Sequence, residues 1–66
     1  MSKRLNEYLI VERRMLRNDI QGFDNAANRL REQMEMLWLN LSDEEREFLG
    51  SRDMMKVIED VERLVL

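Results

Sequence analysis

The chain contains no cysteine, no histidine and no proline, and it has only two glycines. Without cysteine or histidine it cannot form disulfides, the usual zinc sites, a catalytic thiol or the Glu-x-x-His pairs of helical di-iron proteins. A glycine-rich phosphate loop and a nucleophile–base pair are also missing from the sequence. We therefore predict a protein that is not an enzyme, with no catalytic residues, no metal site and no cofactor.

The absence of proline leaves few positions at which a helix must break. In 66 residues, 38% are charged and 44% are hydrophobic, a composition too apolar for a disordered chain and typical of amphipathic helices. So short a chain buries only a marginal core on its own, and stability must come from good helix packing or from oligomerisation. We expect an all-α fold with one helical domain over residues 1–66.

The charge of the chain is weakly negative and unevenly distributed. The net charge of −3 disfavours nucleic acid and anionic membrane as general partners. Residues 1–41 carry seven basic and six acidic side chains, whereas residues 42–66 carry four basic and eight acidic ones. No apolar stretch is long enough to span a bilayer, and no apolar run follows Met1-Ser2-Lys3-Arg4. We expect no membrane segment, no signal peptide and a cytoplasmic location.

Two rows of apolar residues repeat every seven positions. The first row is Leu9, Leu16, Phe23, Leu30 and Leu37, and the second is Ile20, Ala27, Met34 and Leu41. Rows at spacings of three and four are typical of a coiled coil or of a helix packed along its length. The rows pass Gly22 without a change of phase, which predicts one continuous helix over about residues 3–40. The alternative is a turn near residues 18–24, where Asn, Asp and Gly are weak helix formers.

The C-terminal part begins with a clear helix start. Ser42 is followed three residues later by Glu45, the pattern of a capping box, so a short helix is expected over about 43–49. Gly50 and Ser51 are typical of a helix end and a new start, and a second helix is expected over about 52–65. Ser2 is the expected cap of the first helix.

The stretch from Met34 to Leu41 is apolar on nearly every helical face. A helix of that kind needs covering from several sides, so we expect the densest core there. Trp38 is its largest side chain and is expected to contribute most to that core.

These elements predict a helical hairpin in which residues 43–66 fold back antiparallel on the first helix and cover Leu30 to Leu41. The Leu5 to Ile20 end would then lack an internal partner, which predicts a homodimer built as a helical bundle. Its interface residues would be Leu5, Leu9, Leu16, Ile20 and Phe23. A compact three-helix bundle that stays monomeric is the alternative.

The function favoured by these features is a small non-enzymatic protein-binding module, such as an adaptor, assembly factor or inhibitor, that presents a helical surface to a larger protein. The candidate partner-contact residues are Tyr8, Arg13, Arg14 and Arg17, because the three arginines form a basic cluster on the first helix. The alternative is a nucleic-acid-binding regulator that uses the same cluster. Residues 45–61 do outline a helix-turn-helix, but its reading helix is acidic and phosphate would repel it.

Overall fold

The computed structural model describes residues 2–65, and within them it contains four α-helices and no strand. They are α1 (Lys3–Ile20), α2 (Asp24–Leu39), α3 (Asp43–Gly50) and α4 (Met54–Val65). The predicted all-α class is confirmed, whereas the helix count differs from the predicted layout. The first and last residues of the predicted domain, Met1 and Leu66, lie outside the described residues. No helix in the described chain is both long enough and apolar enough to cross a bilayer.

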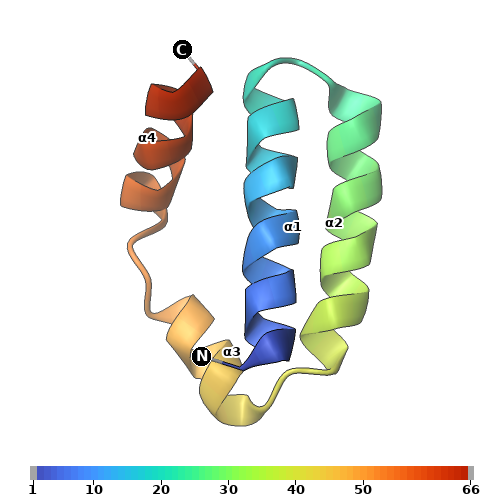
Figure 1. Cartoon of the computed structure of the whole chain (residues 1–66), viewed down its shortest axis with the longest axis vertical. Helices are drawn as coiled ribbons and strands as arrows, with labels where there is room; N and C mark the ends of the chain where they lie inside the picture. Colours follow the sequence, from blue (N-terminus) through green and yellow to red (C-terminus); the bar gives the residue numbers. More distant parts are fainter. Residues whose placement is uncertain (1, 66) are drawn as a thin grey trace.

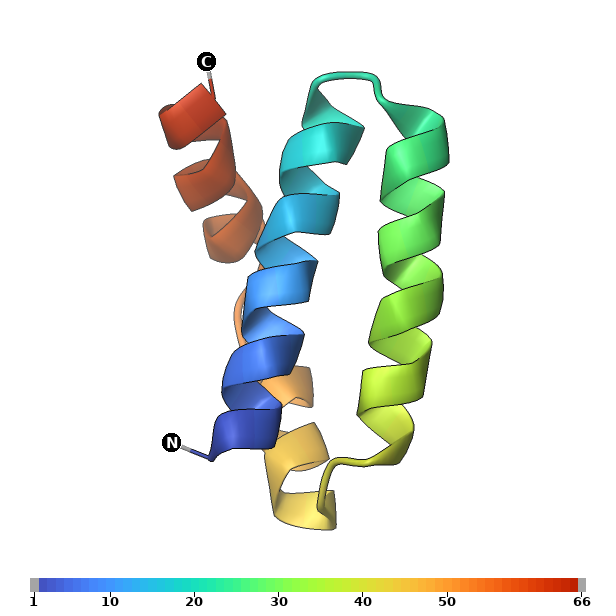
Figure 2. The same cartoon turned by 45° about the vertical axis from the view of Figure 1, so that its right-hand side comes forward.

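Helix α1 lies between α2 and α4, and α3 crosses below its N-terminal end (Figures 1 and 2). Helix α2 runs antiparallel to α1, and α4 runs in the same direction as α1 (Figure 1). The molecule is flattened, with extents of 33 × 23 × 16 Å. Because α2 and α4 flank α1, one long face of α1 has no helix packed against it.

The predicted continuous helix over residues 3–40 is wrong, because the chain reverses direction between α1 and α2. Gly22 has φ +85°, a left-handed conformation that glycine adopts without strain. The Phe23 N–H donates to the Asn18 carbonyl at 2.8 Å, and the Gly22 N–H donates to the Asp19 carbonyl at 3.1 Å. These two bonds form a Schellman motif, which satisfies the last carbonyls of α1 and ends it. The turn is therefore located where the alternative prediction placed it.

The caps predicted at Ser2 and Ser42 are present, whereas the helix C-cap predicted at Gly50 and the helix start predicted at Ser51 are not: Gly50 belongs to α3, and Ser51 is the C-cap of α3. The Ser2 side chain accepts a hydrogen bond from the Leu5 N–H, and the predicted Ser42–Glu45 capping box is present with both of its hydrogen bonds. Helix α3 ends at Gly50, one residue later than predicted. Helix α4 begins at Met54 instead of residue 52, because a carboxylate oxygen of Asp53, and not Ser51, accepts from the backbone of its first turn.

The core consists of two clusters, one toward each end of the molecule. The cluster near α3 contains Leu5, Tyr8, Leu41 and Leu49, and the cluster near the α1–α2 turn contains Met15, Leu16, Ala27 and Val61. Val61 places α4 against α1, so the α1 end that was expected to lack a partner is covered within the chain. Ala27 is fully buried, and its small side chain lets α2 approach α1 closely.

The densest core does not lie in the segment from Met34 to Leu41. Met36 and Leu39 are 66% and 69% exposed and Trp38 is 36% exposed, and only Leu41 is buried. The reason is that α2 packs mainly on α1, so a helix that is apolar on nearly every face is covered chiefly on one side. Apolar side chains on the other sides of α2 therefore remain in solvent.

The conformation of Gly22 predicts the effect of Gly22→Ala. An alanine there would hold a left-handed conformation, which costs about 1 kcal/mol, although no atom lies within 4 Å of the added methyl group. The matched control is Gly50→Ala, at a helical position with equally open surroundings, which should stabilise by up to about 1 kcal/mol. Urea unfolding of both variants measures the two changes. A Gly22→Ala protein as stable as the parent would contradict the left-handed turn.

Candidate protein-binding surfaces

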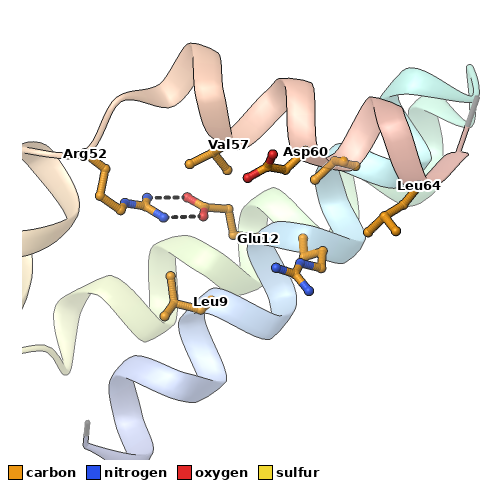
Figure 3. Close-up of a pocket in the computed structure, with 8 residues that line it drawn as sticks. Leu9, Glu12, Arg52, Val57, Asp60 and Leu64 are labelled. Atoms are coloured by element: carbon orange, nitrogen blue, oxygen red, sulfur yellow. Dashed lines mark hydrogen bonds and ion pairs between the residues drawn. The ribbon is translucent and has the colours of Figure 1, made fainter.

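A buried ion pair joins the middle of α1 to the connection between α3 and α4. Glu12 is only 5% exposed, and both of its carboxylate oxygens accept hydrogen bonds from the Arg52 guanidinium at 2.8 Å (Figure 3). The Arg52 Nε–H also donates to the Leu49 carbonyl at 3.2 Å, at the end of α3. This bidentate geometry satisfies both charged groups and fixes the α3–α4 connection on α1.

The same pair sets the electrostatics of Tyr8, one turn before Glu12 on α1. Burial raises the pKa of the Tyr8 phenol, the Glu12 carboxylate raises it further, and the Arg52 guanidinium opposes both effects. The hydrogen bonds from Arg52 to Glu12 raise the pKa of the guanidinium, so it stays charged. The Tyr8 phenol, the Glu12 carboxylate and the Arg52 guanidinium therefore influence one another electrostatically.

A small hollow lies between α1 and α4 next to this pair. Glu12 and Leu9 of α1 face Val57 and Asp60 of α4 across it (Figure 3). Its complete lining is Leu9, Glu12, Arg13, Arg52, Val57, Asp60, Val61 and Leu64. Glu12 and Arg52 in its lining already pair with each other, so the hollow is part of the packing of α4 on α1. Among residues 2–65 no group of three acidic side chains is placed to hold a metal ion.

The uncovered face of α1 carries a shallow groove, here called the arginine surface. Its residues are Asn6, Leu9, Ile10, Arg13, Arg14 and Arg17. The three arginines are exposed, and within residues 2–65 none of them has an acidic side chain within ion-pair distance. Ile10, which is 53% exposed, lies among them. The surface therefore combines unpaired positive charge with accessible apolar area.

A second open groove, here called the tryptophan groove, runs between α1 and α2. It is lined by Tyr8, Met15, Arg31, Met34, Glu35, Trp38 and Leu39. The Trp38 ring lies 6.0 Å from the Tyr8 ring, centroid to centroid, with their planes tilted by 52°. The guanidinium carbon of Arg46 lies 5.8 Å from the Trp38 ring centroid, within cation–π range. Trp38 is thus held in place by its neighbours while part of its ring remains accessible.

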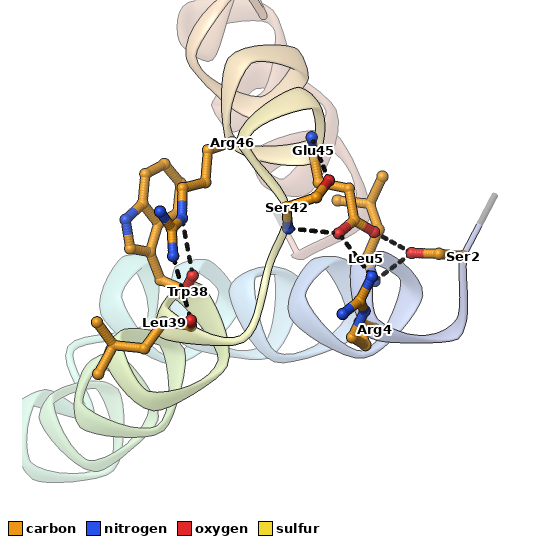
Figure 4. A network of polar contacts seen from close by, with 8 residues as sticks. All are labelled: Ser2, Arg4, Leu5, Trp38, Leu39, Ser42, Glu45 and Arg46. Atoms are coloured by element: carbon orange, nitrogen blue, oxygen red, sulfur yellow. Dashed lines mark hydrogen bonds and ion pairs between the residues drawn. The ribbon is translucent and has the colours of Figure 1, made fainter.

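Arg46 also terminates α2. Its Nε donates to the Trp38 carbonyl, which also accepts from the Leu41 N–H, and its Nη2 donates to the Leu39 carbonyl at the end of the helix; both of these Arg46 bonds are 3.1 Å long (Figure 4). Nearby, Glu45 accepts hydrogen bonds from the Ser2 hydroxyl and the Ser42 N–H. The Ser2 hydrogen bond, followed by that from Ser42, lowers the pKa of the Glu45 carboxyl below its ordinary value. These contacts tie α3 to the ends of α1 and α2.

The residues predicted for an oligomer interface differ in their burial. Leu5 and Leu16 are buried inside the chain, and Leu9 and Ile20 are half-buried against the core. Phe23 lies in the α1–α2 turn and is exposed. Five residues that were expected to form one interface therefore do not form a common exposed surface.

The predicted partner-contact residues lie on two different surfaces. Arg13, Arg14 and Arg17 lie together on the arginine surface, whereas Tyr8 lines the tryptophan groove. Tyr8 and Arg17 are nine residues apart, which places them about 180° apart around a helix with 3.6 residues per turn. The structure therefore contains two separate candidate surfaces on opposite sides of α1.

Sequence reasoning missed the Glu12–Arg52 pair and the exposure of Leu39. A signal for the first was present, because Glu12 lies at helical spacing among Tyr8, Leu5 and Leu16 on the apolar side of α1. A charge at such a position needs a partner, although the pattern alone does not identify Arg52. No local signal identifies Leu39, because its exposure depends on where α3 and α4 lie.

The comparisons with known proteins give no match: no family model, no curated protein and no solved structure matches this chain.

The ion pair predicts a distinctive pair of stability changes. Arg52→Met leaves the buried Glu12 carboxylate without a partner and should destabilise the fold by about 3 kcal/mol or more. The double variant Glu12→Leu, Arg52→Met replaces both charges by apolar groups and should return to within about 1 kcal/mol of the parent. Urea unfolding of the parent and of the single and double variants gives these values. If the double variant is as unstable as Arg52→Met, the loss is not caused by an unpaired buried charge.

The environment of Tyr8 predicts how its phenol titrates. Because the chain has one tyrosine, the ultraviolet absorbance of the phenolate reports on Tyr8 alone. In the folded protein its pKa should exceed the ordinary value of 10.0, and it should return toward that value in urea. The unfolded chain then loses this proton at lower pH, so stability should fall as pH rises above about 10. Glu12→Gln should lower the pKa of Tyr8 in the folded state, and an unchanged value would contradict the coupling.

Proposed function

We propose that this protein is a small non-enzymatic protein-binding module that presents the tryptophan groove to a larger protein. The observation that carries the proposal is an accessible tryptophan held between Tyr8 and Arg46 in an open groove with an apolar lining. Because its ring is already positioned, Trp38 loses little conformational freedom when a partner covers it.

The composition of the groove supports this function. Tryptophan, tyrosine and arginine are enriched among the residues that dominate binding energy at interfaces. Met34, which is half-buried, provides a flexible apolar side chain that adapts to a partner. Arg31 and Glu35 add charged groups, as in the polar rim of an interface. A groove between two helices suits an amphipathic helix that inserts apolar side chains spaced by three or four residues.

Self-association is a second candidate for the same groove. The radius of gyration is 12.0 Å, against about 11 Å for a compact domain of 66 residues. Among the described residues, no large side chain is completely buried. The groove also carries both signs of charge, so a twofold axis would allow Glu35 of one copy to approach Arg31 of another, which already pairs with Asp19 of its own chain at 3.1 Å. We therefore retain a homodimer as a proposal, with the tryptophan groove as its interface in place of Leu5 and Leu16.

The test uses Leu39→Glu, which introduces a charge into the groove at a residue that is 69% exposed. Met36→Glu is the matched control, because Met36 is on the same helix, is 66% exposed and does not line the groove. Circular dichroism should show both variants folded like the parent, since neither side chain belongs to the core. We expect Leu39→Glu alone to lose binding, because an unpaired charge in an apolar contact costs several kcal/mol.

Two measurements identify the occupant. Light scattering of the parent, the variant and the control reports whether a dimer mass is present and whether only Leu39→Glu removes it. Capture of a partner from host extract, repeated with both variants, reports on a foreign protein. Because the chain has one tryptophan, the fluorescence of Trp38 should then shift on addition of the purified partner. If Leu39→Glu and Met36→Glu behave like the parent in both measurements, the tryptophan groove is not a binding site.

A further inference from the structure

The arginine surface is distinct from the tryptophan groove and is unused by the function proposed above. We propose that it is a second docking site, and that its partner is an acidic amphipathic helix of another protein. The occupant is inferred from three properties of the surface: unpaired positive charge, the spacing of its arginines and an exposed apolar side chain among them.

The first property is the isolation of the positive charge. Within residues 2–65 the ion pairs of the chain involve Arg4, Arg31, Arg46, Arg52 and Arg63, and none involves Arg13, Arg14 or Arg17. Of the acidic side chains on α1, Glu12 is buried and paired with Arg52, Asp19 is paired with Arg31, and Glu7 makes no ion pair with the three arginines. A protein with a net charge of −3 therefore displays a positive patch, and such a patch attracts and orients an acidic partner.

The second property is the spacing of the arginines. Arg13 and Arg17 are one helical turn apart, or about 6 Å along the axis. Carboxylates four residues apart on a facing helix have the same separation. Such a helix can therefore place two acidic side chains opposite two guanidinium groups without bending.

The third property is the apolar part of the surface. Ile10 is 53% exposed and Leu9 is half-buried, and both line the groove together with the arginines. An apolar side chain on a docking helix would cover Ile10, whereas a phosphate backbone has no apolar group to place there. The surface therefore fits an acidic amphipathic helix better than a nucleic acid.

The arginine surface and the tryptophan groove lie on opposite sides of α1, so a partner on one leaves the other open. The protein would then connect two partners, one recognised mainly by apolar contacts and the other mainly by charge. This bridging role goes beyond the proposed function and does not depend on it, because the two sites share none of their lining residues.

The test begins with an unbiased selection. A display library of random peptides of helical length is selected on the intact protein. We expect the enriched peptides to be acidic, with apolar residues at spacings of three or four. Absence of enrichment, or enrichment of peptides without acidic residues, would overturn the proposal.

The affinity of the selected peptide is then measured by fluorescence anisotropy. Arg13→Ala, Arg17→Ala should weaken binding about 10-fold, because two ion pairs at an exposed surface are lost. The matched control is Arg29→Ala, Lys56→Ala, which removes two exposed positive charges that lie outside the surface. The control should bind like the parent, and an equal loss in the control would show attraction to net charge alone and overturn the proposal.

Ile10→Ser removes an apolar contact without changing the charge, so it distinguishes a helical peptide from nucleic acid. It should weaken the selected peptide several-fold and leave binding of a short duplex DNA unchanged. DNA that binds more tightly than the peptide, with sensitivity to the arginines but not to Ile10, would overturn the proposal in favour of nucleic acid. A dimer mass that Arg13→Ala, Arg17→Ala alone abolishes would overturn it in favour of a second copy of this chain.

Discussion

The bidentate contact between Glu12 and Arg52 decides where the C-terminal half of the chain lies. Each of these charges is costly when it is buried alone, so an arrangement that separates them is penalised, even though the formed pair adds little net stability. Arg52 lies between α3 and α4, and its contact with α1 therefore positions both helices. Because α4 is held on the side of Glu12 and Leu16, the arginines of α1 remain uncovered.

Local hydrogen bonding could be predicted from the sequence. Ser2 and Ser42 cap their helices as expected, because a cap needs only a few consecutive residues of the right type.

The phase of the apolar rows could not distinguish the α1–α2 turn from a continuous helix. Leu16 and Leu30 belong to two antiparallel helices, each of which requires its own seven-residue spacing in order to pack. Phe23, the residue that connects their phases, is exposed in the turn and takes no part in the core. The Gly22-Phe23-Asp24 sequence contained the better signal, since glycine after a helix is the usual residue of a Schellman motif.

The two candidate surfaces differ in how far they could be predicted. The arginine cluster was evident, because Arg13, Arg14 and Arg17 are close in sequence and lie on one face of a helix. Their separation from Tyr8 also follows from helical geometry, since nine residues correspond to half a turn beyond two full turns. The tryptophan groove was not predictable in the same way. Trp38 and Leu39 are in a segment that any amphipathic analysis assigns to the core, and they are exposed only because α4 packs mainly on α1.

A thin arrangement of helices explains why so small a chain has two open surfaces of different character. Helix α1 contacts α2 on one side and α4 on the next, and the face that remains carries arginines, which are well hydrated when no partner is bound. Helix α2 packs mainly on α1, so the apolar residues beside that contact stay accessible, and their exposure is unfavourable until a partner covers them. The gain on binding therefore differs between the surfaces. At the tryptophan groove it comes mainly from removing apolar area from water. At the arginine surface it comes from pairing charges, so salt should weaken only the second kind of contact strongly.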